Sequence, residues 1–151
     1  MTRHSRISTR LLSIAVLVMS ISIFLPDVQA DSTGITPGIY TTTIAGSDVP
    51  PEFPPDVASI LVGQWQIEFT EGGTYIVTKD GDIVVIGRYT SHSSRFVMTD
   101  LQGALACTDA PGIATGVYRW SLANNQLELL SVLDRCAGRQ LVLTTRPLQK
   151  Q

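Results

Sequence analysis

Ile60-Leu-Val-Gly-Gln-Trp-Gln-Ile-Glu-Phe69 is the stretch of sequence that decides the expected fold. From Gln64 onward its polar and apolar residues alternate strictly, which places Trp65, Ile67 and Phe69 on one side of an extended chain. Successive side chains of a β-strand point to opposite faces, so this alternation is typical of a strand with one buried and one wet face. The stretch therefore predicts a half-buried strand.

Seven further segments share this character and are separated by residues that favour turns, loops or extended connections. Asp80-Gly81 is the strongest hairpin signal among them. Eight strands joined mostly by short connections predict an all-β fold, an eight-stranded antiparallel up-and-down β-barrel, with a two-sheet sandwich as the alternative. The expected strands cover residues 38–44, 61–69, 74–79, 83–90, 95–100, 115–122, 126–133 and 139–146.

Residues 1–30 have the composition of a secretory signal peptide. Three arginines precede the apolar run Leu11–Leu25, and Val28-Gln-Ala30 supplies small residues at a cleavage site. The run is shorter than the ~20 residues of a spanning helix, although an uncleaved membrane anchor stays open as the alternative. We expect cleavage after Ala30, a secreted or periplasmic location, and no membrane insertion of the mature chain.

Residues 31–151 then form a single β-barrel domain. Residues 46–56 interrupt it as a connector, because four prolines within six residues forbid a central strand and a regular helix. Within and just after this connector, Asp56–Ile60 can form one helical turn with Asp56 as its cap.

Charge and cysteine content limit the function classes. Without residues 1–30 the chain keeps eight basic and twelve acidic groups, a net charge of −4, which argues against nucleic acid or an anionic membrane as partner. Cys107 and Cys136 are the two cysteines, and in an oxidising compartment they are expected to form a disulfide. A free or metal-binding pair is less favoured, since no C-x-x-C motif is present.

The sequence offers little for catalysis, and we expect no enzyme activity, no cofactor and no metal. His92 is the only histidine after residue 30, and it lies in a polar Ser-rich turn that favours a solvated side chain over a Ser-His-Asp site. Asp80 and Asp82 flank Gly81, but without a longer ligand series a hairpin turn is favoured over a calcium loop.

Gly63-Gln-Trp65 at the start of a strand resembles the Gly-x-Trp motif of lipocalins and the wider calycin group. Gly116-x-Tyr-x-Trp120 and Asp134-x-Cys-x-x-Arg139 are similar to segments of small bacterial lipocalin-like secreted proteins of unknown role. The resemblance covers about residues 34–146 and implies a lipocalin-like barrel. One departure is that a strand at 38–44 precedes the Trp strand, whereas the family's Trp lies on the first barrel strand.

In that group the Trp closes the base of the barrel, and an Arg near the chain end packs across it. Arg139 is the preferred candidate here, with Arg146 as the alternative. A buried Arg needs a partner, so we expect Trp65, Arg139 and Asp134 to form a structural plug, with a cation–π contact to the indole. The functional entrance is then expected at the opposite end, among Ser91–Ser94 and Leu101–Ala114.

Large apolar residues on the predicted inner faces are the candidate ligand-binding residues. Small eight-stranded barrels are either filled by side chains or hold one ligand. We expect a lipocalin-like binding protein for a small apolar or amphipathic molecule, with tyrosine hydroxyls and indole N–H groups fixing its orientation. The residues expected to contact the ligand are Phe69, Tyr75, Tyr89, Phe96, Met98, Tyr118, Trp120 and Leu129.

Two alternatives stay open. One is a purely structural, filled barrel. The other is a protein-interaction module, because the chain also resembles periplasmic metalloprotease inhibitors, which are lipocalin-like barrels that insert an N-terminal trunk into the protease. Residues 31–38 would be that trunk. The cavity volume and the position of this segment discriminate between the readings.

Overall fold

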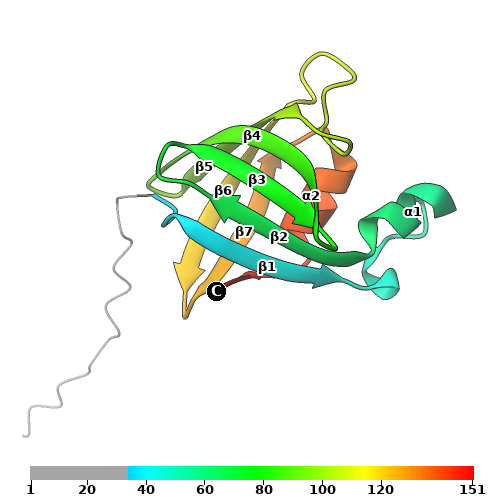
Figure 1. The fold of residues 1–151 in the computed structure, drawn as a ribbon, viewed down its shortest axis with the longest axis horizontal. Helices are drawn as coiled ribbons and strands as arrows, with labels where there is room; N and C mark the ends of the chain where they lie inside the picture. The colour runs from blue at the N-terminus through cyan, green and yellow to red at the C-terminus, as the bar shows by residue number, and fades with distance from the viewer. Residues whose placement is uncertain (1–33) are drawn as a thin grey trace, which may run out of the picture.

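The structure, a computed structural model that describes residues 34–151, is a closed antiparallel β-barrel whose eight strands follow one another in sequence order (Figure 1). The predicted fold class is therefore confirmed. The strands are β1 (Gly38–Ile44), β2 (Gly63–Phe69), β3 (Thr74–Lys79), β4 (Asp82–His92), β5 (Arg95–Gln102), β6 (Thr115–Ala123), β7 (Gln126–Leu133) and β8 (Leu148–Lys150). Two α-helices, α1 (Pro55–Leu61) and α2 (Ala137–Thr144), and a short 3₁₀ helix, η1 (Gly46–Asp48), complete the described chain.

The first strand closes the barrel. β1 pairs with β2 over its whole length, from Gly38 opposite Phe69 to Ile44 opposite Gly63. On its other edge Tyr40 lies opposite Lys150 in β8. The strand that precedes the Trp strand is therefore part of the barrel, and closure leaves β1 with partners on both sides.

The hairpin turns follow the predicted chemistry. Asp80 and Gly81 have φ values of 50° and 100°, and Asn124 and Asn125 have φ values of 52° and 62°. Two consecutive residues with positive φ form a two-residue turn whose twist matches that of the flanking strands, and Asn, Asp and Gly tolerate this conformation best. These turns fix the registers of the β3–β4 and β6–β7 hairpins.

The predicted last strand, residues 139–146, is wrong. This segment forms α2, and the closing strand is the shorter β8, which begins after Pro147. Arg139, Leu141 and Leu143 alternate as in a strand, but Val142 is buried as well. Three consecutive buried residues do not fit a strand with one buried and one exposed face, but they fit a short helix packed among apolar residues.

Helix α1 ends the proline-rich connector. Pro55 occupies its first turn, where the missing N–H costs nothing, and Pro54 is the cap in place of the expected Asp56. The helix ends at Leu61, whose carbonyl accepts a 2.9 Å hydrogen bond from the indole Nε1 of Trp65. This bond fixes α1 to the start of β2.

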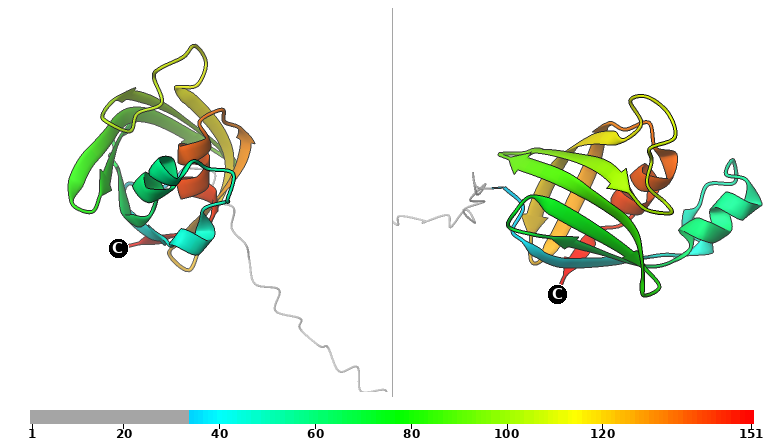
Figure 2. Two further views of the ribbon diagram at one scale, coloured as in Figure 1. Left: turned by 90° about the vertical axis from the view of Figure 1, so that its right-hand side faces the viewer. Right: turned by 45° about the horizontal axis from the view of Figure 1, so that its top comes forward.

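The two ends of the barrel differ. Both helices cover one end, with α2 within the mouth of the barrel and α1 in front of it (Figure 2). We call this the helical end; it carries the starts of β2, β4 and β6. The other end, where β2 finishes at Phe69, we call the aromatic end.

The expected entrance is corrected by this arrangement. Ser91–Ser94 connects β4 to β5 at the aromatic end, whereas most of Leu101–Ala114 connects β5 to β6 at the helical end. The connections before and after one strand of an up-and-down barrel lie at opposite ends. The two segments therefore do not surround one opening, and Leu101–Ala114 lies at the same end as Trp65.

The expected signal peptide, residues 1–30 with cleavage after Ala30, lies outside the described residues. Within residues 34–151 no helix has the length and apolar character needed to cross a membrane. The disulfide described below is typical of an oxidising compartment such as the extracellular space.

Candidate ligand-binding site

A cavity of about 240 Å³ lies inside the helical end of the barrel. Its walls are almost entirely apolar. Helix α1 contributes Leu61, α2 contributes Val142 and Leu143, and the β5–β6 connection contributes Leu105. From the barrel come Trp65, Ile67, Tyr75, Val77, Val85 and Met98.

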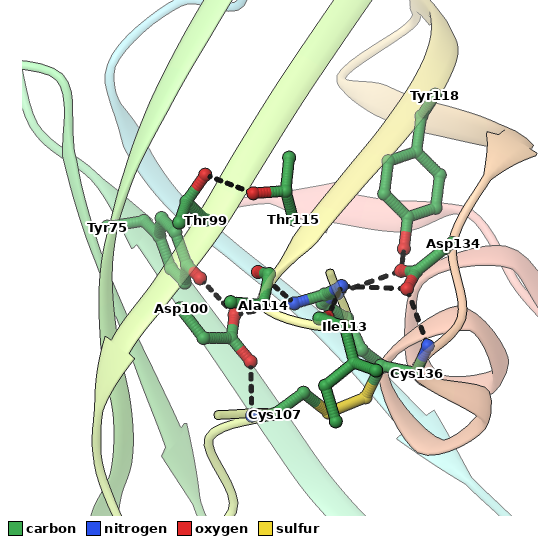
Figure 3. Close-up of polar contacts among 11 residues, drawn as sticks. Tyr75, Thr99, Asp100, Cys107, Ile113, Ala114, Thr115, Tyr118, Asp134 and Cys136 are labelled. Carbon is green, nitrogen blue, oxygen red and sulfur yellow. Dashed lines mark hydrogen bonds and ion pairs between the residues drawn. A yellow bond between two sulfur atoms is a disulfide. The ribbon is translucent and has the colours of Figure 1, made fainter. Parts of the chain in front are cut away.

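The polar part of the wall belongs to a set of five residues that we call the Arg139 cluster, three of which line the cavity (Figure 3). Arg139 and Asp100 line the cavity, and their side chains are only 7% and 2% exposed. An unpaired buried charge is expensive, so the partners of these groups decide whether the cluster is structural or reactive. Its members are Tyr75, Asp100, Tyr118, Asp134 and Arg139.

All five N–H groups of Arg139 have partners. The Nε and Nη2 atoms donate to the two oxygens of Asp134 at 2.8 and 2.7 Å, a bidentate pair. Nη1 lies 3.0 Å from Asp100 Oδ1. The remaining donors of Nη1 and Nη2 reach the carbonyls of Ala114 and Ile113, both at 2.8 Å. The guanidinium therefore bridges two carboxylates and the start of β6.

The two carboxylates sit in parallel surroundings. Asp100 accepts hydrogen bonds from the hydroxyl of Tyr75 and from the backbone N–H of Cys107. Asp134 accepts them from the hydroxyl of Tyr118 and from the backbone N–H of Cys136. Each half thus links one barrel tyrosine to one cysteine through an aspartate.

The sequence makes room for both halves with glycines. A Cβ at Gly87 would lie 2.3 Å from the ring of Tyr75, and one at Gly116 would lie 2.6 Å from Asp134 Oδ2. These distances are far below any normal contact. The two glycines therefore serve close packing under neighbouring side chains rather than free space in the barrel.

These surroundings raise the pKa values of three residues of the cluster. Burial raises the pKa of the Tyr75 hydroxyl, and its hydrogen bond to Asp100 raises it further. Burial and the hydrogen bond to Asp134 raise the pKa of Tyr118 in the same way. Burial alone would lower the pKa of Arg139, but the hydrogen bond to Asp134 and the charges of both carboxylates outweigh it and raise that pKa. Both hydroxyls therefore stay protonated, and the guanidinium stays charged.

The Cys107–Cys136 disulfide is confirmed, with the two Cα atoms 6.1 Å apart. It joins the β5–β6 connection to the residue before α2 and lines the cavity. Together with the two aspartates it ties these segments to the barrel wall.

The structure brings two members of the proposed plug together and places the third elsewhere on the cavity wall. Arg139 and Asp134 form the bidentate pair, and Trp65 lines the same cavity. The cation that lies over the Trp65 ring is the ammonium of Lys79, 6.0 Å from its centre.

Of the eight residues expected to contact a ligand, Tyr75 and Met98 line the cavity. Four others belong to an edge-to-face and tilted stack of rings that fills the aromatic end together with Tyr40. These four are Phe69, Tyr89, Phe96 and Tyr118. Within the described chain no partner is found for the buried indole Nε1 of Trp120.

Trp120 and Leu129 border a larger groove, of about 690 Å³, beside the α2–β8 connection. Arg119, Glu128 and Arg146 also line it. The groove is more open to solvent than the cavity and its lining mixes charged and apolar groups, so it would desolvate a small apolar molecule less completely. We therefore take the cavity as the candidate site despite its smaller volume.

The described part of the expected N-terminal trunk packs on the barrel. Ile35 is 4% exposed, and its backbone N–H donates to the hydroxyl of Ser91 at 2.8 Å. Residues 31–33 lie outside the described chain. From residue 34 the segment thus lies against the aromatic end and does not project from it.

Sequence reasoning missed the cavity residues that come from outside the strands, namely Val57, Leu105 and Val142. Val57 and Leu105 lie in connections, and Val142 lies in a segment predicted as a strand. The available signal was that such residues interrupt otherwise polar or proline-rich stretches.

Comparison of the chain with protein-family models, curated proteins and solved structures finds no significant match. The closed eight-stranded antiparallel barrel is compatible with a lipocalin-like fold.

Proposed function

We propose that this protein is a lipocalin-like binding protein of an extracytoplasmic compartment, which takes a small apolar molecule into the cavity at its helical end. Binding rests on apolar burial, and the chain acts as a carrier or sensor rather than as an enzyme. The site differs from the expected one, since it lies at the Trp65 end of the barrel.

The observation that carries the proposal is a partly open cavity of about 240 Å³ with apolar walls, next to a polar cluster whose charged groups are paired with one another. Protein interiors are normally close-packed, with few voids larger than a water molecule. The aromatic end of the same barrel is packed in that way. The space at the helical end is thus a local property of the site, and an apolar cavity of such size favours an apolar occupant over water.

Native mass spectrometry of the secreted protein tests the proposal first, because a bound molecule adds a discrete mass that is lost on denaturation. The second test is titration with 4-phenylbutan-1-ol, a single ring with a short chain, followed by calorimetry and by tryptophan emission in a Trp120→Phe background, where Trp65 is the only tryptophan left. Saturable binding with one site per chain is expected. No added mass together with no saturable binding would contradict the function.

A cavity-filling variant tests whether the ligand binds in the cavity. Val142→Phe adds a ring to the cavity wall, and it should weaken binding of the alcohol at least about tenfold, or 1.4 kcal/mol. Val132→Phe is the matched control, because Val132 is 55% exposed on β7 and does not line the cavity. Val77→Ile, which adds one methylene to the wall, serves if the larger change prevents folding. Equal affinity in the cavity and control variants would place the ligand elsewhere.

A further inference from the structure

We propose that the cavity selects electrically neutral, compact ligands and rejects carboxylates, because the Arg139 cluster beside it is saturated with hydrogen bonds and carries a net negative charge. This inference rests on the proposed function and adds the chemical class of the ligand. It assigns to Arg139 a role opposite to that of an anion-binding arginine.

Every N–H donor of Arg139 already has a partner. An arginine on a pocket wall ordinarily suggests recognition of a carboxylate or phosphate. Here the five N–H groups of Arg139 already reach Asp134, Asp100 and the carbonyls of Ile113 and Ala114. The hydroxyls of Tyr75 and Tyr118 likewise donate their hydrogen bonds to Asp100 and Asp134. An incoming carboxylate would find no free donor in the cluster.

The charge of the cluster also disfavours an anionic ligand. Two carboxylates and one guanidinium give the cluster a net charge of −1 when all three are ionised, and Asp100 itself lines the cavity. The Lys79 ammonium lies over the Trp65 ring on the same face of the sheet, but Lys79 does not line the cavity and its charge is paired with Asp80. A ligand carboxylate would therefore lose its hydration and face a like charge in an apolar enclosure. A ligand ammonium would also lose its hydration, but it would face an opposite charge.

The volume of the cavity limits the size of the ligand. A dry cavity of about 150 Å³ holds benzene, so 240 Å³ corresponds to roughly ten non-hydrogen atoms, a single ring with a short chain or a small bicyclic molecule. Long-chain lipids exceed this space. The walls place aliphatic and sulfur-containing side chains around most of it, with one indole and one phenol ring.

A series of three matched probes tests the inference at pH 7 on the intact chain. The probes are 4-phenylbutan-1-ol, 4-phenylbutylamine and 4-phenylbutyrate, which share ring and chain and differ in end group. We expect the alcohol to bind tightest, the amine next, and the carboxylate at least about 30-fold more weakly than the alcohol, which corresponds to about 2 kcal/mol.

The outcomes separate the two proposals. The analogue without an end group, n-butylbenzene, is tested beside the three probes. If none of the four compounds binds, the proposed binding function is wrong. If all bind and the carboxylate equals or exceeds the alcohol, the cavity binds ligands but the selectivity inferred here is overturned. Tighter binding of the amine than of the alcohol would contradict the inferred preference for neutral ligands, although it would agree with a negative potential at the cluster.

The variant Asp100→Asn tests the electrostatic cause. It removes the negative charge that lines the cavity and nearly preserves the shape of the side chain, so the affinity ratio between alcohol and carboxylate should narrow by about tenfold. Asp82→Asn, an exposed charge on the β3–β4 hairpin, is the control and should leave the ratio unchanged. An unchanged ratio in folded Asp100→Asn protein would contradict the electrostatic argument, and the wild-type probe series stands on its own if that variant does not fold.

Discussion

The two ends of this barrel are closed in different ways. At the aromatic end five rings stack edge to face or tilted, and Phe69, Phe96 and Tyr118 are essentially inaccessible. At the helical end two short helices and the β5–β6 connection close over the strands, and a cavity remains beneath them. Rings on adjacent strands pack directly against one another. The two helices and the β5–β6 connection pack less closely, and polar interactions and a disulfide hold them to the barrel.

The interactions that hold the helical end together are the Arg139 cluster and the disulfide. They connect β5, the β5–β6 connection, the start of β6 and the turn before α2 at one place (Figure 3). The aromatic end has no comparable ion cluster among the described residues. If this contrast is correct, changes at the helical end should act through charge and chain connectivity, and changes at the aromatic end through packing.

The largest effect is expected for Arg139→Ala. It leaves Asp100 and Asp134 buried without a counter-charge, which should lower the free energy of unfolding by about 3–5 kcal/mol. Denaturant titration measures this loss. Arg146→Ala is the control, since Arg146 pairs with Asp48 at the surface and should change the midpoint little. An unchanged midpoint for Arg139→Ala would mean that the cluster does not hold this end together.

The second largest effect is expected from removing the disulfide. Cys107→Ser combined with Cys136→Ser opens a loop with a sequence separation of 29, and the loop-entropy relation gives roughly 3–4 kcal/mol. Hydrogen exchange should then rise in residues 101–114 and in α2 more than in β1 and β2. Reductant should reproduce the loss in the native chain and leave the double variant unaffected. Uniform acceleration across the barrel would contradict a role confined to the helical end.

Most of the fold follows from the sequence because its signals are local. Seven of the eight strands lie within two or three residues of the predicted bounds, since alternation and two-residue turns such as Asp80-Gly81 act over a few neighbours. The eighth failed where the local signal is ambiguous. Arg139, Leu141 and Leu143 suit a strand or a short helix, and only the burial of Val142 in the folded chain decides.

The candidate site was less accessible to such reasoning. Its polar core was partly anticipated, because a buried Arg139 requires a partner and Asp134 is five residues away. Asp100, 39 residues away, gave no local sign of joining it. The cavity depends on how α1, α2 and the β5–β6 connection meet, which no short pattern encodes. The position of Leu101–Ala114 was nevertheless predictable, since strand order alone places it opposite Ser91–Ser94.

A matched pair of leucines compares the two kinds of packing at smaller scale. Leu127 is fully buried away from the cavity, whereas Leu143 is 2% exposed and lines it. Leu143 already lacks contact atoms on its cavity side, so Leu143→Ala should cost about 1 kcal/mol less than Leu127→Ala within the usual range of ~2–5 kcal/mol for such changes. Chemical unfolding of the two variants measures the difference. Equal costs would indicate that the cavity closes in solution.

The smallest effect concerns alkaline pH and the tyrosines of the two ends. The pKa of Tyr75 is raised by burial and by its bond to Asp100, while an unfolded tyrosine loses its proton near pH 10. Above about pH 10 the unfolded chain therefore binds fewer protons than the folded chain, so stability is fully present below that pH and falls as pH rises, by about 1.4 kcal/mol per pH unit for each such group. Tyr75→Phe should flatten this decline when unfolding free energies are compared between pH 9 and 11. Tyr89, whose hydroxyl donates to the carbonyl of Thr70 at the aromatic end, has a pKa raised by burial alone. Tyr89→Phe should therefore flatten the decline less, and an equal effect of the two substitutions would mean that the carboxylates add nothing to the alkaline response of the helical end.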